Sequence, residues 1–336
     1  MQNVPKTTKG VILQEVPTNP PVYGEATLPE LTEDSVLVKI HSAPINPADV
    51  QCVKGVFPHG KTLPTTSGLE GSGLVIAAGA SEKAQALLNK RVCFLTGPKP
   101  GSWGEHTVIA AKQAHVLPDD VDYEQGAMVL VNPLTVAGFL LVCEERGYTS
   151  IAHAAAASQI GRNLISGAKK AGITVVNFVR RAEQAKILND LGADAVIDKS
   201  QEGWEEKAEK VLAEHKVQAY FDALGGEDGG KIFKLLPDES VTHVYGCLTY
   251  QPLVVDSSHI RHRGKDVTGF WIKKQLAKPE RAKKIFALTF ANLAEGVFKS
   301  AIANRFTQEN FQDALEFYKK GASKGKVLLQ NPNFEQ

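Results

Sequence analysis

The sequence predicts an α/β protein in which a β-rich first part is followed by a doubly wound parallel sheet. Over the first third of the chain, short apolar runs are separated by turn residues, which is typical of a barrel-like or sandwich domain. From about residue 150, β-branched runs alternate with segments whose apolar residues recur at helical spacing, which is typical of a parallel sheet covered by helices. The length of 336 residues fits about two such domains.

The first part is expected to consist of short strands. Apolar runs at 36–40, 73–78 and 91–95 predict three of them. The segment at 97–104, GPKPGSWG, predicts an exposed turn because glycine and proline dominate it.

The second part repeats a strand and a helix several times, and the end of the chain adds further elements. Strands are predicted at 150–154, 174–179, 195–198, 217–223 and 240–246, and helices at 158–171, 182–191 and 229–236. Helical spacing returns at 281–298 and 308–319, and a short strand is predicted at 326–329.

Composition and charge exclude several classes of protein. Lys plus Arg number 38 and Asp plus Glu 37, so no basic surface for nucleic acid or an anionic membrane is expected. The segment from Gln125 to Cys143 carries no charge, but Asn132 and Pro133 indicate a loop and a buried helix rather than a membrane span. The first ten residues resemble neither a secretory signal nor a transit peptide, which favours a cytoplasmic location.

The strongest chemical signal is the junction between the strand at 150–154 and the helix that follows it. Ala156, Ser158 and Gly161 take the three positions of a G-x-G-x-x-G motif, although only the last is glycine. Small residues at these positions allow a backbone to approach a pyrophosphate, which then lies on the amides of the helix N-terminus. A plain packed turn between a strand and a helix is the alternative interpretation.

The end of the next strand distinguishes between the two nicotinamide dinucleotides. An NAD site offers an acid about 20 residues after the motif, whereas an NADP site offers arginine for the 2′-phosphate. Here Arg180 and Arg181 take that place and the first acid, Glu183, comes later. NADPH is therefore the predicted cofactor, and Lys199, after the third strand, is a weaker candidate for the same phosphate.

Other catalytic motifs are missing from the sequence. It contains no HEXXH, no G-x-S-x-G and no Y-x-x-x-K motif. The four cysteines lie far apart, with no CxxC pair, so no metal site is expected. His41, His106 and His153 lie in or beside predicted strands and are interpreted as structural side chains.

Several segments together resemble the medium-chain dehydrogenase/reductase superfamily, in its zinc-free quinone oxidoreductase and 2-enoyl reductase branch. The resemblance covers nearly the whole chain. It rests on 46–49 (NPAD), 64–79 (PTTSGLEGSGLVIAAG), 101–105 (GSWGE), 131–135 (VNPLT), the nucleotide turn, 221–226 (FDALGG), 269–272 (GFWI) and 325–329 (GKVLL).

This resemblance implies a GroES-like catalytic domain built from both ends of the chain, with a Rossmann domain inserted between them. The implied boundaries are 1–128 and 276–336 for the catalytic domain and 129–275 for the Rossmann domain. Zinc-dependent members would carry a cysteine near Asn46 and a histidine beside Glu70, and neither is present. An enzyme without zinc is therefore expected.

The resemblance also implies roles for individual residues. Asn46 and Thr135 would be the catalytic positioning groups, and with Asn132 they would surround the nicotinamide ribose and the reacting carbonyl. The remaining cofactor contacts would come from Ser158, Gln159, Ile160, Gly161, Arg180, Arg181, Lys199, Tyr245, Leu248, Phe270, Trp271, Ile272 and Lys326.

One departure from the branch concerns the proton donor. Its enoyl thioester reductases carry a tyrosine where this sequence has Phe57, and a phenyl ring gives no proton. His59, in the same expected substrate pocket, is a candidate donor. General acid catalysis is worth about 10²–10⁴ in rate, so a quinone or an activated enone, which accepts hydride with less help, is the preferred substrate class.

The predicted function is thus an NADPH-dependent oxidoreductase that transfers hydride to a quinone or an α,β-unsaturated carbonyl compound. Two alternatives stay open: a reductase of 2-enoyl-CoA or acyl-carrier thioesters, and an NADPH-binding redox sensor or structural protein with little turnover. The expected partners are a small-molecule substrate and, by resemblance, a second copy of the chain joined near 241–255. Nucleic acid and membrane insertion are not expected.

Overall fold

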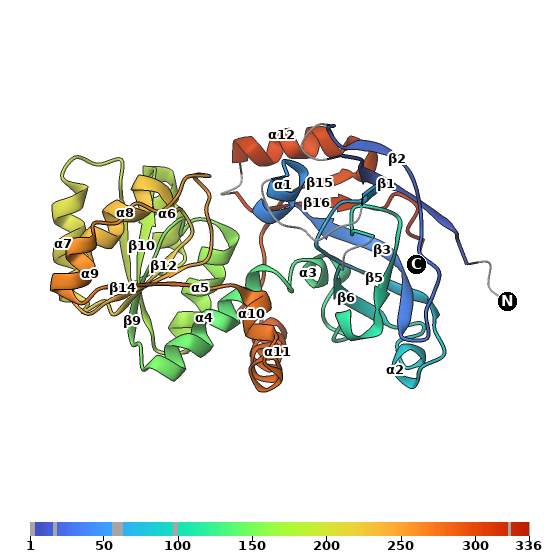
Figure 1. Ribbon diagram of the computed structural model, residues 1–336, viewed down its shortest axis with the longest axis horizontal. Coiled ribbons are helices and arrows are strands. Elements are labelled where there is room, and N and C mark those ends of the chain that lie inside the picture. The colour runs from blue at the N-terminus through green and yellow to red at the C-terminus, as the bar shows by residue number, and fades with distance from the viewer. Residues whose placement is uncertain (1–3, 16–18, 56–62, 97–99, 322–323, 336) are drawn as a thin grey trace. The chain divides into compact units, whose positions relative to one another are not determined.

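The chain folds into two compact units, which are described separately. The computed structural model describes residues 4–15, 19–55, 63–96, 100–321 and 324–335 (Figure 1). Unit 1 comprises residues 1–131 and 300–336, and unit 2 comprises residues 132–299. Both ends of the chain therefore belong to the same unit, and unit 2 is an insertion between them.

Unit 1 is rich in β-strands. A three-stranded sheet has the order β2-β1-β4, and a seven-stranded sheet has the order β15-β16-β3-β5-β6-β8, with β7 also paired to β3. The strands are β1 (Thr7–Leu13), β2 (Val22–Thr27), β3 (Ser35–Pro44), β4 (Thr65–Thr66), β5 (Glu70–Ala78), β6 (Arg91–Leu95), β7 (His106–Ala110), β8 (Ala114–Val116), β15 (Ile302–Thr307) and β16 (Lys326–Gln330).

Helices in unit 1 are few and mostly short. They are α1 (Pro47–Val53), α2 (Glu82–Gln85), α3 (Tyr123–Ala127), α12 (Phe311–Gly321) and the 3₁₀ turns η1 (Ala111–Gln113) and η2 (Gln308–Asn310). Val36, Val38 and Ile40 alternate along β3 and enter one hydrophobic cluster, as the two-residue period of a strand requires. This packing fixes β3 as the central strand, and β16 pairs with it antiparallel at residues 42–44.

Unit 2 is a parallel sheet with helices. Its strands are β9 (Ser150–His153), β10 (Thr174–Val179), β11 (Ala195–Asp198), β12 (Ala219–Asp222), β13 (Val241–Val244) and β14 (Asp266–Gly269). Its helices are α4 (Asn132–Arg146), α5 (Gln159–Lys170), α6 (Ala182–Asp190), α7 (Trp204–Glu214), α8 (Gly226–Leu235), α9 (Ser257–Arg263), α10 (Ile272–Leu276) and α11 (Pro279–Ala294).

The strand order of unit 2 identifies its topology. All neighbouring strands are parallel, and their order is β11-β10-β9-β12-β13-β14. Numbered along the chain this is 3-2-1-4-5-6, the order of dinucleotide-binding folds, in which the ligand lies at the carboxyl ends of the strands where the order reverses. The reversal falls between β9 and β12, so the predicted doubly wound sheet is confirmed.

The uncharged segment before β9 forms part of the core of unit 2. Helix α4 buries eleven of its residues, among them Leu134, Phe139 and Leu141. This agrees with the predicted buried helix. Among the described residues, no helix is both long enough and apolar enough to cross a membrane.

The second domain boundary differs from the expected one. A boundary after residue 275 would place helix α11 in the catalytic domain, whereas α11 belongs to unit 2, whose limit lies between Lys299 and Ser300. The reason is packing, since α11 contacts α4 and buries Ile285 in the same cluster as Phe139.

Candidate active site and dinucleotide site

A buried polar group lies in unit 1 where α1 begins. Asn46 precedes α1 and is fully buried, and its backbone N–H donates to Asp49 Oδ2 at 2.8 Å. Its side-chain Nδ2 donates to Glu70 Oε1 at 2.9 Å, and its Oδ1 accepts a short hydrogen bond from Lys326 Nζ. Strands β5 and β16 thus bring one anion and one cation to the two ends of a single amide.

Glu70 also accepts hydrogen bonds from the backbone at residues 130 and 131, near the end of the first part of unit 1. Its Oε2 accepts the backbone N–H groups of Leu130 at 2.9 Å and Val131 at 2.8 Å. Burial raises the pKa of Glu70 to about 7, while the charge of Lys326 and the hydrogen bond from Asn46 oppose this rise. Burial likewise lowers the pKa of Lys326. Sequence reasoning missed Glu70 as a functional residue, although a lone acid in a glycine-rich strand is itself a signal, because a buried charge must be paired.

The turn between β9 and α5 in unit 2 has the geometry that a pyrophosphate needs. Ser158 caps α5, and its hydroxyl accepts the backbone N–H of Gly161 at 3.3 Å. A Cβ on Gly161 would lie 2.2 Å from the carbonyl oxygen of Ala156, so only glycine allows this close packing. No acidic residue stands in the first turn of α5. The helix N-terminus, formed by Ser158 to Gly161, therefore favours an anion.

Two arginines follow the neighbouring strand β10. Arg180 and Arg181 are exposed, and neither forms an ion pair with any residue that the structure describes. Lys199, the weaker candidate, pairs with Asp228 at 3.1 Å and lies 5.8 Å above the ring of Trp204. Its charge is already compensated, whereas those of the two arginines are not.

Aromatic residues pack together at the carboxyl ends of strands β9, β13 and β14 of unit 2. Tyr245, just after β13, is half-buried, and its hydroxyl lies 2.8 Å from Nε2 of His153 at the end of β9. Burial lowers the pKa of His153 to about 3. The rings of Tyr245 and Phe270 both pack edge-on against Phe139. The interpretation of His153 as a structural side chain is consistent with this arrangement.

The remaining predicted contacts are spread over unit 2. Asn132 begins α4 and Thr135 is buried one turn further on. Trp271 caps α10 and is 42% exposed, and Ile272 follows it. Leu248, in the loop after β13, is also exposed. The predicted pocket residues Phe57 and His59 lie outside the described residues.

Lys326, a predicted cofactor contact, lies next to Asn46 in unit 1. It is only 5% exposed, and its ammonium donates to Asn46 within unit 1. The structure therefore joins Lys326 to a predicted catalytic residue.

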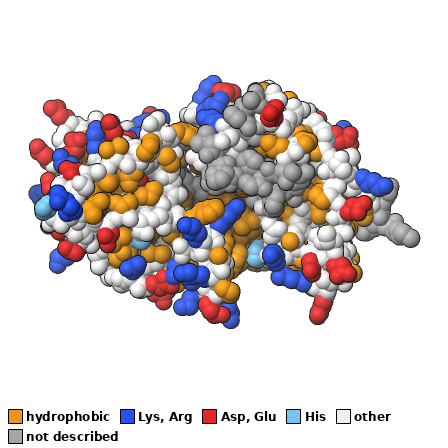
Figure 2. Space-filling view, viewed as in Figure 1, with side chains coloured by type: hydrophobic (Ala, Val, Ile, Leu, Met, Phe, Trp, Pro, Cys, Tyr) orange, Lys and Arg blue, Asp and Glu red, His pale blue; other side chains and the backbone are white. Residues whose placement is uncertain are grey.

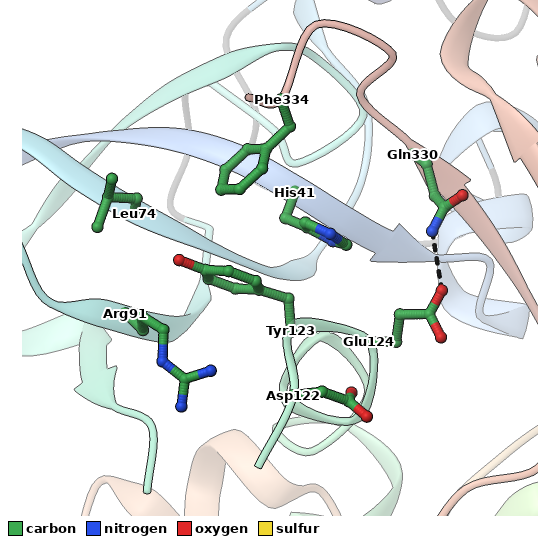
Figure 3. A pocket seen from close by; sticks show the side chains of 8 residues that line it. All are labelled: His41, Leu74, Arg91, Asp122, Tyr123, Glu124, Gln330 and Phe334. Carbon is green, nitrogen blue, oxygen red and sulfur yellow. Dashed lines mark hydrogen bonds between the residues drawn. The ribbon is translucent and has the colours of Figure 1, made fainter. Parts of the chain in front are cut away.

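A hollow of about 590 Å³ also lies in unit 1, and none of the predicted site residues lines it (Figure 3). His41 stacks on Tyr123 at 4.8 Å, and Phe334 from the C-terminal segment packs edge-on against both rings. Glu124 at its rim accepts hydrogen bonds from Arg305 and Gln330. These contacts fix the C-terminal segment onto β3 and α3.

Comparisons with known proteins agree with the two units. Residues 32–119 match the family model of the alcohol dehydrogenase GroES-like domain, and residues 160–291 match that of the zinc-binding dehydrogenase. The mitochondrial enoyl-[acyl-carrier-protein] reductase of Arabidopsis thaliana is 28% identical over 80% of this chain and 73% of its own length.

Solved structures with the same fold cover almost the whole chain. A protein of Mesorhizobium loti, provisionally described as an NADPH:quinone reductase, is 25% identical and superimposes with a TM-score of 0.89 over 98% of this chain and 100% of its own. A complex with NADP and crotonyl-CoA is 20% identical, with a TM-score of 0.80 over 96% of this chain and 99% of its own. The chain belongs to the medium-chain dehydrogenase/reductase superfamily of oxidoreductases.

Proposed function

We propose that this protein is an NADPH-dependent oxidoreductase that reduces a quinone or an α,β-unsaturated carbonyl compound without zinc. The observation that carries the cofactor assignment is the pair Arg180 and Arg181 at the carboxyl end of β10 beside the nucleotide turn, where neither forms an ion pair with a described residue. Planar guanidinium groups suit a phosphate, and an NAD site would present a carboxylate here. NADPH, when bound, supplies the hydride.

The residues of this chain would bind and orient the cofactor. Ser158 to Gly161 would hold the pyrophosphate on the amides at the N-terminus of α5. Tyr245 and Phe270 directly follow β13 and β14, and they are the proposed neighbours of the nicotinamide. Thr135 and Asn132, in the first turn of α4, are the proposed partners of its ribose.

Asn46 is the proposed hydrogen-bond donor to the reacting oxygen. An amide Nδ2 carries two protons, and the described residues accept only one of them, at Glu70 Oε1. We take the second proton, which no described residue accepts, as the donor to a substrate carbonyl. As hydride reaches the conjugated carbon, negative charge grows on that oxygen, and a fixed donor stabilises it.

The buried group of unit 1 also supports the zinc-free assignment. Zinc sites in proteins use thiolate, imidazole and carboxylate ligands. Here the ammonium of Lys326 occupies the position next to Asn46 and Glu70, and a cation repels another cation. Among the residues that the structure describes, no three His, Cys, Asp or Glu side chains form a group able to hold a metal ion.

Reduction of an enoyl thioester is the second candidate, because the curated relatives are named as enoyl-[acyl-carrier-protein] reductases. The experiment that separates the candidates follows the loss of nicotinamide absorbance with menadione, cyclohexenone and crotonyl-CoA, each with NADPH and with NADH. The proposal expects turnover of menadione or cyclohexenone to exceed that of crotonyl-CoA. Preferred turnover of crotonyl-CoA would establish the second candidate, and NADPH binding without any turnover would favour a redox sensor.

A further inference from the structure

The amide of Asn46 is held between two opposite charges that do not touch each other. Lys326 donates to its Oδ1 and Glu70 accepts from its Nδ2, while no direct ion pair joins Lys326 to Glu70. Glu70 is 1% exposed and Asn46 fully buried. We call this set of three side chains the amide bracket.

With Glu70 ionised and Lys326 protonated, the bracket permits only one orientation of the amide. An ammonium group has protons and no acceptor, so it must face Oδ1, and an ionised carboxylate only accepts, so it must face Nδ2. Rotating the amide by half a turn would place donor against donor at Lys326 and acceptor against acceptor at Glu70. Leu130 and Val131 fix the carboxylate in turn, through two backbone N–H groups on Oε2.

The bracket also strengthens the remaining donor. A cation hydrogen-bonded to an amide oxygen draws electron density away from the nitrogen, so the N–H protons carry more positive charge. The free Nδ2 proton is therefore a better hydrogen-bond donor than that of an ordinary asparagine.

We infer that Glu70 and Lys326 are positioning residues for the reduction, which act through Asn46 on the carbonyl oxygen of the substrate. Glu70 fixes the direction of the amide, and Lys326 polarises it. This inference rests on the proposed function, since it takes Asn46 as the donor to that oxygen. It implies that substitution of Glu70 or Lys326 changes kcat and leaves the binding of the cofactor unchanged.

The test exchanges charges inside the bracket. In the double variant Asn46→Asp with Glu70→Gln, Lys326 keeps an acceptor, and the new amide at position 70 can donate to position 46 and accept from Leu130 and Val131. Total charge is conserved and every bracket contact has a counterpart, but position 46 no longer carries an N–H for the substrate. We expect Tm and the Kd of NADPH close to those of the unmodified protein, with kcat lower by roughly 10²-fold, the effect of removing one oxyanion donor.

Single variants test each positioning residue. Glu70→Gln and Lys326→Met are each expected to lower kcat at least tenfold and to leave the KM for NADPH unchanged. In protein that already carries Asn46→Ala, neither substitution should lower kcat by more than about a further twofold. The matched control is Glu124→Gln, which alters another carboxylate of unit 1 that is bonded to a charged partner.

The outcomes separate the two claims. Unmodified protein that reduces neither menadione, cyclohexenone nor crotonyl-CoA would overturn the proposed function and with it the inference. Normal turnover by the charge-exchanged double variant would overturn the inference alone. The inference alone would also be overturned if Glu70→Gln and Lys326→Met lowered kcat as strongly in the Asn46→Ala background as in the unmodified protein. If the single variants fail to fold, the double variant, which preserves the contacts, still decides the question.

Discussion

At the scale of the residue, the histidine at the end of β9 makes a pH-dependent contribution to stability. His153 is buried beside the hydroxyl of Tyr245, and burial lowers its pKa to about 3 from a usual value of 6.5. Between these values the unfolded chain binds a proton that the folded chain does not bind. Stability from this group is therefore fully present above pH 6.5 and falls as the pH falls, by about 1.4 kcal/mol for each pH unit. Urea unfolding between pH 7 and pH 5 should show a shallower dependence in His153→Gln than in the unmodified protein. The same substitution at exposed His262 is the control, and equal slopes for His153→Gln and the unmodified protein would contradict this account.

At the scale of the element, the turn before α5 depends on one glycine. Gly161→Ala would place a methyl group 2.2 Å from the carbonyl oxygen of Ala156, and a backbone atom cannot turn aside as a side chain can. We expect a loss of stability of about 1–3 kcal/mol, as for other overpacked sites, together with weaker NADPH binding. The measurements are Tm by circular dichroism and a fluorescence titration. Gly24→Ala is the control because the nearest atom to its new methyl group would lie 3.8 Å away. Unchanged Tm and affinity in Gly161→Ala would show that the turn tolerates a side chain.

Some of the helices and strands could be predicted from the sequence and others could not. Strand β10 has the predicted bounds, because a β-branched run between turn residues has few other interpretations. Helix α7 was not predicted, although Trp204, Ala208, Val211 and Leu212 recur at helical spacing along WEEKAEKVLAE and pack in one cluster. Strand β14 was missed because all four of its residues are exposed. Asn46 was found by resemblance, but its bracket joins residues 46, 70 and 326, and only the folded pairing of β16 with β3 brings the last of them to the site. The position of Glu70 in a glycine-rich strand indicates that its charge is paired, but residue type does not show that Leu130 and Val131 supply backbone N–H groups to it.

At the scale of the whole molecule, we expect a homodimer that forms through the edge of the sheet in unit 2. Among the described strands β14 pairs only with β13, and an unpaired edge is a template for another strand. Val267 on this edge is 39% exposed, and Figure 2 shows hydrophobic side chains among charged ones on the visible face of unit 2. Light scattering should give the mass of two chains at micromolar concentration, and Val267→Lys should shift it toward one chain without changing the circular dichroism spectrum. A monomeric unmodified protein would refute the expectation.

The measurement that tests the central claim most directly is a tryptophan fluorescence titration of the protein with NADPH and with NADH. It is made on the unmodified chain and on the double variant Arg180→Ala with Arg181→Ala. Charge-assisted hydrogen bonds contribute about 1.5–3 kcal/mol, so removing both guanidinium groups should weaken NADPH binding roughly tenfold to a hundredfold and leave NADH binding unchanged. Tighter binding of NADH than of NADPH by the unmodified protein, or a variant that binds NADPH as well as before, would contradict the assignment of these arginines to the 2′-phosphate.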